Sequence, residues 1–285
     1  MNITRTQLSF FLVLCSYLLS GSAAAESWLR HPKWDEGLAE IGLYEGKLLK
    51  YGALRDAMVD LITVREYFHP DRKVKTPSAT TGNRDSVPVM KQNLTRRIRT
   101  GIYEYIQAGS TFVHRDTGRL VKISAVSTEW CGNSSATITC VGSEYELRIA
   151  NYMDNEGLSL DSVSTSSDVL FYDQLLLHLR GNADSLQPGR AFRLVDSMVS
   201  NNPAYRERAA SITSIEHFPG DGITTPLIII AVRVGNDTET FHLADDPLRH
   251  LVRWENDRGE HLSLRKRLFL DYWNRSRPGD EQWLE

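Results

Sequence analysis

Few of the side chains that carry catalysis or bind metal ions are spaced for that chemistry in this sequence. The eight histidines are scattered, and no two stand three or four residues apart, as two zinc ligands on one helix face would. The sequence also lacks Gly-x-Ser-x-Gly, His-Glu-x-x-His and a glycine-rich phosphate loop. Asp245 and Asp246 are adjacent, but neighbours on a strand point to opposite faces and cannot share a substrate. We therefore assign no catalytic residue, metal or cofactor, and a non-enzymatic role is favoured.

The cysteines that follow the N-terminal segment are Cys131 and Cys140. An even number of cysteines in an exported chain is typical of a disulfide. The spacer from Gly132 to Thr139 is rich in turn residues and could bring the two Cα atoms within bridging distance. Neither cysteine has a nearby histidine or a Cys-x-x-Cys arrangement that would lower its pKa. The sequence therefore predicts a structural disulfide between Cys131 and Cys140.

Two basic clusters have two interpretations. They comprise Lys91, Arg96, Arg97 and Arg99, and the run Arg265-Lys266-Arg267. Such clusters could hold a phosphate-bearing lipid or a polysaccharide. Alternatively, the cations decorate the solvated faces of strands, where they also discourage pairing between sheet edges. Aromatic residues such as Tyr103, Tyr105 and Trp130 likewise could line an apolar cavity or simply pack in the core.

The N-terminal residues have the layout of a secretory signal peptide. Arg5 precedes the apolar run Leu8–Leu19, and the small residues Gly21–Ala25 provide a cleavage point before Glu26. The apolar run is shorter than the roughly 20 residues that span a bilayer. Large residues precede Cys15, which does not fit a lipid-anchoring signal. We therefore expect residues 1–25 to be removed, the mature chain to have no transmembrane segment, and the protein to be periplasmic or extracellular.

The mature chain is expected to form a single β-rich domain over residues 26–285. Removing residues 1–25 deletes only Arg5 among the charged residues, so the formal net charge changes from -3 to -4. This mild acidic balance gives no electrostatic footprint for nucleic acid. The polar stretch 75–85, which lacks large apolar residues, is expected to be a flexible loop.

Alternating apolar and polar residues indicate strands with one buried face. Ala39, Ile41 and Leu43 alternate with more polar residues, as do Tyr145 and Leu147. Glycine-containing turns, which are typical of hairpins, separate several of these stretches, so an antiparallel sheet is predicted. Further strands are expected over 58–68, 87–94, 110–114, 120–129, 158–163, 212–218, 227–234, 239–243, 248–255 and 261–272.

One segment departs from this alternation. Its apolar residues repeat at helical spacing, which predicts an amphipathic helix over Asp168–Arg180, and a second short helix is considered over Ala204–Ala210. Leu227–Val232 is apolar on both faces and is expected to lie beneath the first helix as a central strand. The helix and this strand together have more apolar surface than one face of a sheet usually buries, so a ligand cavity is predicted between them. Its expected lining is Val169, Tyr172, Leu176, Leu179, Ile228 and Ile230.

Several segments together resemble an exported bacterial family of unknown function. They are Tyr44–Glu66, Glu129–Gly132, the helix Leu170–Leu175 continuing through Leu179-Arg180 to Leu186–Gly189, and Leu264–Trp273. The resemblance covers most of the mature chain and implies a half-barrel similar to the lipoprotein-localisation carriers, with a curved antiparallel sheet wrapping one amphipathic helix. Some similar chains are labelled septum formation inhibitor Maf, a name that belongs to cytosolic nucleotide pyrophosphatases. The expected leader and the lack of a Ser-x-Arg-Arg motif at the mature N-terminus argue against that activity.

Three functions remain open at this point. The first is a non-enzymatic envelope protein that binds or carries an amphipathic, lipid-like ligand or a partner segment. The second is a hydrolase of envelope glycan or lipid that uses an unrecognised carboxylate pair. The third is a structural interaction module without a small ligand. Because the first follows from fold analogy, it requires evidence from a site.

Overall fold

The computed structural model describes residues 28–76, 86–152, 157–166, 168–221 and 225–285. The expected leader at 1–25 and most of the expected loop at 75–85 lie outside these residues. Within the described ranges, no helix has the length and apolar character needed to cross a membrane.

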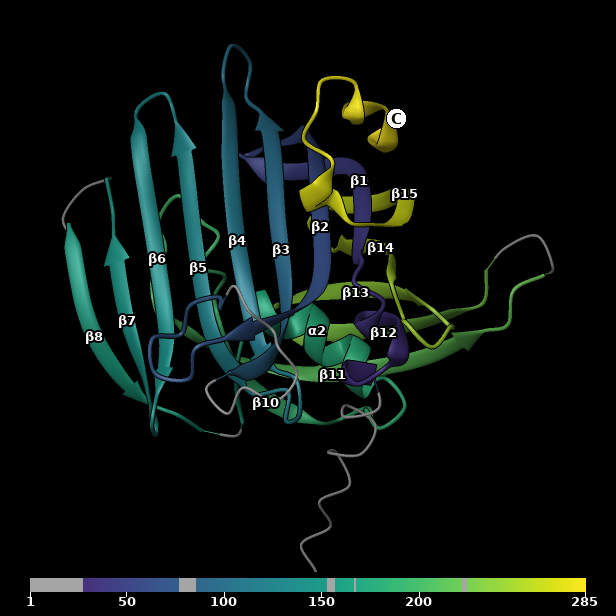
Figure 1. The fold of residues 1–285 in the computed structure, drawn as a ribbon, viewed down its shortest axis with the longest axis horizontal. Helices are drawn as coiled ribbons and strands as arrows, with labels where there is room; N and C mark the ends of the chain where they lie inside the picture. Colours follow the sequence, from purple (N-terminus) through teal and green to yellow (C-terminus); the bar gives the residue numbers. More distant parts are fainter. Residues whose placement is uncertain (1–27, 77–85, 153–156, 167, 222–224) are drawn as a thin grey trace, which may run out of the picture.

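The described strands form one curved sheet whose order is β8-β7-β6-β5-β4-β3-β2-β1-β15-β14-β13-β12-β11-β10-β9 (Figure 1). Neighbours are antiparallel except β9 and β10, which are parallel. The bounds are β1 (Ala39–Lys50), β2 (Ala53–Phe68), β3 (Val87–Arg99), β4 (Glu104–His114), β5 (Leu120–Glu129), β6 (Gly132–Val141), β7 (Glu144–Ala150), β8 (Leu158–Ser164), β9 (Val169–Phe171), β10 (Ala191–Val195), β11 (Glu207–Phe218), β12 (Leu227–Val234), β13 (Asp237–Ala244), β14 (Leu251–Asn256) and β15 (His261–Leu270).

The α-helix of the described chain, α2 (Tyr172–Asn182), lies between two walls of this sheet. In Figure 1 the long strands β2 to β8 form the front wall, and β11 to β13 run behind it at a steep angle. Leu175 and Leu179 of α2 are buried in one core cluster with Val59 of β2 and Ile230 of β12. The predicted fold, a curved and mainly antiparallel sheet that wraps one helix, is therefore confirmed.

The sheet rolls up instead of closing. Its β9 end turns into the concave side of the opposite wall, where Phe171 packs in a second core cluster with residues of β5, β6 and β7. The rings of Phe171 and Tyr145 of β7 meet edge to face, with centroids 5.3 Å apart. Packing against this wall covers the short β9 strand at the edge of the sheet, where unpaired backbone groups would otherwise be exposed.

Two local predictions differ from the structure. The helix begins at Tyr172 rather than Asp168, because Val169 to Phe171 pair in parallel with β10 as strand β9. The second helix expected over Ala204–Ala210 is not formed. Glu207 begins strand β11, and Ala210 pairs with both β10 and β12. In both places pairing with a distant segment overrides the local pattern.

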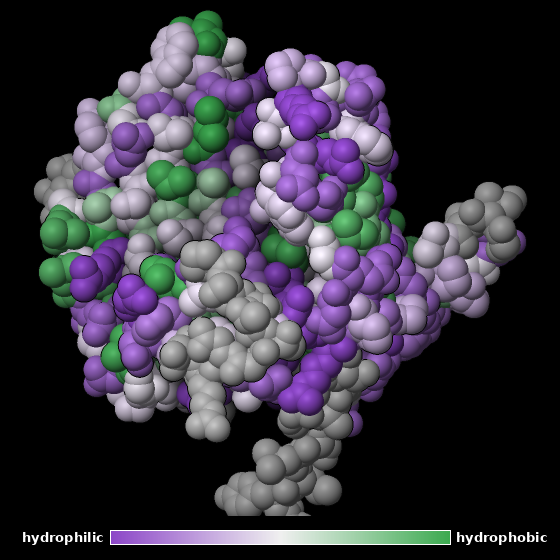
Figure 2. Space-filling model, viewed as in Figure 1, coloured by the Kyte–Doolittle hydropathy of each residue, from purple (hydrophilic) through white to green (hydrophobic). Residues whose placement is uncertain are grey.

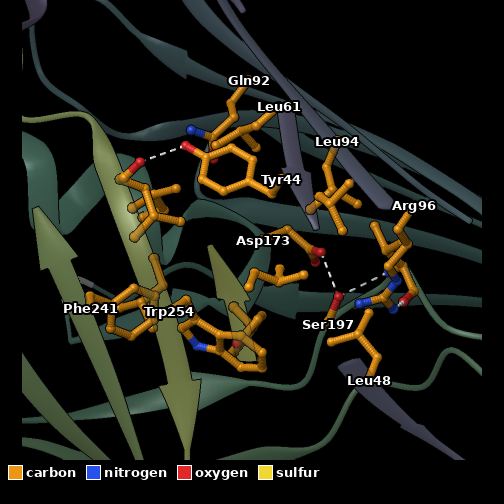
Figure 3. Close-up of a pocket in the computed structure, with 17 residues that line it drawn as sticks. Tyr44, Leu48, Leu61, Gln92, Leu94, Arg96, Asp173, Ser197, Phe241 and Trp254 are labelled. Carbon is orange, nitrogen blue, oxygen red and sulfur yellow. Dashed lines mark hydrogen bonds between the residues drawn. The ribbon is translucent and has the colours of Figure 1, made fainter. Parts of the chain in front are cut away.

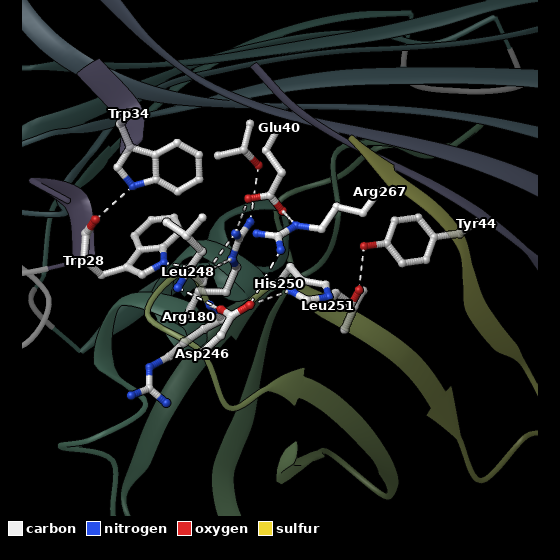
Figure 4. A network of polar contacts seen from close by, with 12 residues as sticks. Trp28, Trp34, Glu40, Tyr44, Arg180, Asp246, Leu248, His250, Leu251 and Arg267 are labelled. Atoms are coloured by element: carbon white, nitrogen blue, oxygen red, sulfur yellow. Dashed lines mark hydrogen bonds and ion pairs between the residues drawn. The ribbon is translucent and has the colours of Figure 1, made fainter. Parts of the chain in front are cut away.

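Buried polar contacts join α2 to β1 and to the segment before the 3-10 helix η1 (Pro32–Asp35) (Figure 4). Arg180 is 1% exposed, and its Nη2 donates to Glu40 Oε2 at 2.7 Å and to the Leu248 carbonyl at 2.8 Å. Its guanidinium lies 4.7 Å from the ring centroid of Trp28, whose indole N–H donates to the same carbonyl. Arg267 lies 3.6 Å from the other Glu40 oxygen. These five residues, the Arg180 network, hold the helix end in place through groups of the protein itself.

Candidate functional site

A cavity of about 130 Å³ lies between the first strands of the sheet and α2, and is partly open to solvent (Figure 3). Its walls come from β1, β2, β3, β13, β14 and β15, from α2, and from the segment after β10. The lining residues are Tyr44, Leu48, Val59, Leu61, Gln92, Leu94, Arg96, Tyr172, Asp173, Leu175, Leu176, Ser197, Val199, Phe241, Leu251, Trp254 and Leu262. Most of these side chains are aliphatic or aromatic, as is usual in ligand pockets.

The alternation of the strands places these side chains. Residues two or four apart on a strand share a face, which brings Tyr44 and Leu48 of β1 and Val59 and Leu61 of β2 to the cavity. The Tyr44 hydroxyl donates to the Leu251 carbonyl at 2.8 Å and thereby joins β1 to β14 across the wall. The shape of the cavity is thus held by hydrogen bonds between strands that are far apart in the sequence.

Gln92 of β3 is the first polar group that distinguishes this cavity from ordinary core. The residue is only 5% exposed, and its Nε2 has no hydrogen-bond partner among the described residues. Figure 3 shows Gln92 beside the Tyr44 ring at the cavity wall. A buried donor without a partner costs about 1–3 kcal/mol. An acceptor brought into the cavity by a ligand would remove that cost.

Arg96, four residues further along β3, is the second such group. Its Nε donates to the Gln107 side-chain oxygen at 2.6 Å, and its Nη2 donates to the Val199 carbonyl. Within the described ranges, no carboxylate forms an ion pair with Arg96. Burial is the main cause that lowers the pKa of this guanidinium. The cavity wall therefore contains a cation whose observed hydrogen bonds go to neutral groups.

Asp173, in the first turn of α2, completes the polar part of the lining. It accepts hydrogen bonds from the Ser197 hydroxyl at 2.7 Å and from the Met198 backbone N–H at 2.8 Å. Burial raises the pKa of the Asp173 carboxyl, while these bonds and the positive charge of Arg96 oppose the rise. Asp173 thus fixes the segment after β10 against the helix. The hydrogen bonds of Arg96 go to Gln107 and Val199 instead.

Tyr172 forms a separate polar contact at the cavity wall. Its hydroxyl donates to Glu239 Oε2 at 2.6 Å, and the Trp254 indole N–H donates to the same oxygen at 2.9 Å. Burial is the largest cause that raises the pKa of Glu239. Because one Glu239 oxygen already accepts two hydrogen bonds, this carboxylate serves to position the two aromatic rings.

Comparisons with known proteins give a likeness of fold alone. No family model matches the sequence, and no curated protein matches it. A solved structure that is similar is the "Beta-barrel-like Protein of Domain of Unknown Function DUF1849 from Brucella abortus". The two chains are 11% identical, the TM-score is 0.50, and the match covers 82% of this chain and 98% of the other. This result agrees with the expected likeness to a bacterial domain of unknown function with a barrel-like fold.

The cavity lies on a different side of α2 from the one predicted. Tyr172 and Leu176 line it, whereas Leu179, Ile228 and Ile230 pack tightly in the core between the helix and β12. Val169 packs with the β5 to β7 wall. Leu227–Val232 was expected to be covered on both faces, but only the face that carries Ile228 and Ile230 is fully buried. The helix therefore covers the face of β12 that carries Ile228 and Ile230, and the other face is half-buried.

The predicted disulfide between Cys131 and Cys140 is not formed, and both cysteines are free. The spacer expected to form a turn is strand β6, which begins at Gly132 directly after Cys131 and contains Cys140 near its far end. An extended strand rises about 3.3 Å per residue, so the two Cα atoms lie far beyond the roughly 7 Å limit for a disulfide. In the described part of the chain, moreover, no group of three or more potential metal ligands comes together.

Gln92, Asp173 and Ser197 were not predicted as site residues, and Arg96 was predicted only as part of a basic cluster that either holds a phosphate-bearing lipid or a polysaccharide or decorates a solvated strand face. A signal for two of them exists in β3, whose inward-facing residues are Met90, Gln92, Leu94, Arg96 and Ile98. Polar residues at alternate positions of an otherwise apolar face mark groups that need a buried partner. Arg97 and Arg99 lie on the other face, where they form ion pairs with Asp60 and Glu104.

Proposed function

We propose that this protein is an exported, non-enzymatic binding protein that holds an amphipathic ligand, or the end of a partner segment, in the cavity between β1–β3 and α2. The observation that carries the proposal is the buried Gln92 Nε2, which lacks a partner and faces an apolar cavity. Removing apolar surface from water and satisfying this donor both favour an occupant that has an apolar body and an oxygen acceptor.

The size of the cavity limits how much of a ligand it can enclose. Its volume of about 130 Å³ is close to that of an engineered cavity of about 150 Å³ that takes up benzene. It is smaller than the roughly 300–1,000 Å³ typical of pockets for drug-sized ligands. We therefore propose that one ring or a short stretch of alkyl chain is enclosed and that the rest of the ligand leaves through the open side.

The polar groups suggest how the ligand is oriented. Gln92 and Arg96 face the same cavity from one strand and are separated by Leu94, so their side chains lie along one wall. A carboxylate or phosphate oxygen near Arg96 would form a charge-assisted bond that no described carboxylate provides. The proposal is therefore narrowed to amphipathic molecules that carry an acceptor, and an anionic one is favoured.

Decanoate and decanol provide the test, with binding measured by isothermal titration calorimetry. We expect decanoate to bind more tightly than decanol, and we expect Leu176→Asp, which places a charge in the cavity, to abolish binding of both. Leu54→Asp is the matched control, because Leu54 is exposed on β2. This variant should bind both ligands as the wild type does. Gln92→Leu should weaken decanoate binding about tenfold, the equivalent of one hydrogen bond. Absence of binding to the wild type, or equal binding by the two aspartate variants, contradicts the proposal.

The proposed export is tested separately in the native host. The expected leader predicts a mature chain that begins at or near Glu26 and carries no acyl group. Intact mass spectrometry measures this directly. A mass that includes residues 1–25, or a diacylglyceryl addition, contradicts the export proposal but leaves the cavity proposal intact.

A further inference from the structure

Three neighbouring hairpins place large apolar side chains at the upper end of the sheet in Figure 1. Tyr51 lies at the β1–β2 turn, Ile102 and Tyr103 at the β3–β4 turn, and Trp130 at the β5–β6 turn. We call these four residues the rim. Ile102 is 84% exposed and Trp130 is 74% exposed, the highest values among the large hydrophobic residues of the described ranges. In Figure 2 hydrophobic surface is visible at this upper end of the molecule. Turn tips are normally polar, so this composition needs an explanation.

The rim side chains are held in place by contacts between hairpins. The rings of Tyr103 and Trp130 lie with centroids 5.8 Å apart, and the Tyr103 hydroxyl donates to the Tyr51 hydroxyl at 3.1 Å. Tyr51 and Tyr103 each also lie 6.0 Å from the ring of Tyr105, which is buried beneath them. The exposed apolar groups are therefore presented as a fixed surface that spans three hairpins.

The charge around the rim differs in sign from that of the whole chain. We count the last four residues of each outgoing strand and the first four of each returning strand at these hairpins. Outside the cavity they contain the five cations Lys47, Lys50, Arg55, Arg97 and Arg99 against the three carboxylates Asp56, Glu104 and Glu129, which gives a net charge of +2 when the buried Arg96 of the cavity wall is left out. The whole chain has a formal net charge of -3. A surface that complements the rim is therefore apolar at its centre and negatively charged.

We propose that the rim docks on the surface of a lipid bilayer that contains anionic lipids. Tryptophan and tyrosine are enriched at membrane interfaces, where the ring is in apolar surroundings and the polar atom stays hydrated. Each basic residue near an anionic leaflet contributes roughly 1 kcal/mol to the attraction. The rim and the five cations near it outside the cavity supply both contributions at one end of the molecule.

One side of the cavity is nearer to the rim than the other. Leu48 of the cavity lies on β1 three residues before Tyr51, and Arg96 lies on β3 six residues before Ile102. The Arg96 side of the cavity is therefore the side nearer to the rim. The docking proposal does not depend on the proposed ligand, because the rim is outside the cavity and its test uses vesicles alone.

Vesicle flotation tests the proposal. We expect the full-length mature protein to float with vesicles of phosphatidylcholine and phosphatidylglycerol, to bind vesicles of phosphatidylcholine alone more weakly, and to lose binding as salt screens the charges. The double variant Ile102→Ser/Trp130→Ser should reduce the partition coefficient more than about tenfold, because it removes two large apolar groups. The matched control is Leu158→Ser/Leu160→Ser on edge strand β8, where the leucines are 69% and 66% exposed.

The outcomes separate lipid docking from other uses of the rim. Circular dichroism and the thermal midpoint show whether the rim variant remains folded. If it does not fold, the milder variant Ile102→Ser is compared with Leu160→Ser in the same flotation assay. Wild-type protein that fails to float, or rim and control variants that float alike, would overturn the proposal. A concentration-dependent dimer that is lost in the rim variant, without vesicle binding, would instead identify a second copy of the chain as the occupant.

Discussion

Two arginines project into the interior of the same rolled sheet, and their surroundings differ. Arg180, at the end of α2, donates to a carboxylate and a carbonyl and stacks on Trp28. Arg96, near the start of α2, donates to an amide oxygen and a carbonyl and faces an open cavity. In the first region the Arg180 guanidinium is paired with a carboxylate, although Nε and Nη2 of the neighbouring Arg267 are buried without a hydrogen-bond partner among the described residues. In the second, polar groups lie beside space that no protein group fills.

This difference shows how a binding site can be distinguished from a structural polar cluster without a bound ligand. A buried charge with a bonded counter-charge holds the fold together, whereas a donor without a partner next to a cavity indicates an absent molecule. The free energy of unfolding tests this distinction, and the largest effect is expected at Arg180.

Arg180→Met is expected to lower the free energy of unfolding by about 3–5 kcal/mol, because it leaves Glu40 buried without its main partner. Urea denaturation followed by circular dichroism measures this loss. The double variant Arg180→Met/Glu40→Met should recover part of it, since no isolated charge remains. Arg96→Met is the matched comparison and should cost less than about 2 kcal/mol, because it breaks bonds only to neutral acceptors. If Arg180→Met and Arg96→Met lower the free energy of unfolding by the same amount, the contrast between the two regions is lost.

Acid should weaken the helix that joins the two regions. Burial, with a smaller effect of Arg190, lowers the pKa of His178 in α2 to about 4. In the unfolded chain His178 has the ordinary histidine pKa of about 6.5, so between pH 6.5 and 4 the unfolded chain binds more protons than the folded protein. The free energy of unfolding therefore falls as the pH decreases through this range. The loss from this residue reaches at most about 3 kcal/mol.

His178→Gln removes this pH dependence, so the difference in unfolding free energy between wild type and variant should shrink on acidification. Asp173 and Glu239, whose pKa values are raised, act in the opposite direction in both proteins and largely cancel in the difference. Urea denaturation at several pH values between 4 and 7 provides the measurement. A difference that stays constant across this range contradicts the assigned protonation of His178.

Gln92→Leu is expected to have the smallest effect, between no change and a stabilisation of about 1 kcal/mol. The substitution removes a buried donor that lacks a partner and adds apolar contact in the cavity wall. Thermal unfolding of the ligand-free protein is the measurement. Gln107→Leu is the control and should destabilise the protein, because Gln107 accepts from Arg96 and donates to Ser127. A marked loss of stability in Gln92→Leu would show that Gln92 is a structural residue.

Much of the sheet could be predicted from local alternation of side chains. Strands β5 and β12 have the bounds that were expected, and the curved antiparallel sheet around one helix is confirmed. The errors occur where a distant partner decides the conformation. Val169 to Phe171 continue the helical spacing of α2, yet they pair with β10. Likewise, the spacer between Cys131 and Cys140 has turn residues, yet it is held extended between β5 and β7.

The candidate site was less accessible to prediction because its position depends on which side of α2 is filled. The sequence shows that both the helix and β12 are apolar, but it does not show that Leu179 and Ile230 fit together closely enough to leave no space. The free space lies instead beside Leu176, opposite β1 to β3. Gln92 and Arg96 were detectable as interruptions of an apolar face, but their partners depend on the three-dimensional packing.

The pairing of β1 with β15 also has a consequence for how the chain folds. Ala39 lies opposite Leu270, so the sheet consists of two meanders joined through strands from opposite ends of the sequence. Several hairpins within the meanders, such as β1–β2 and β5–β6, have short loops and can form within microseconds, whereas the joining step must close a very long loop. During synthesis β1 is made long before β15, and one edge of β1 stays unpaired in the interval. The nascent chain therefore exposes a strand edge that can pair with other chains until its own partner strand is made.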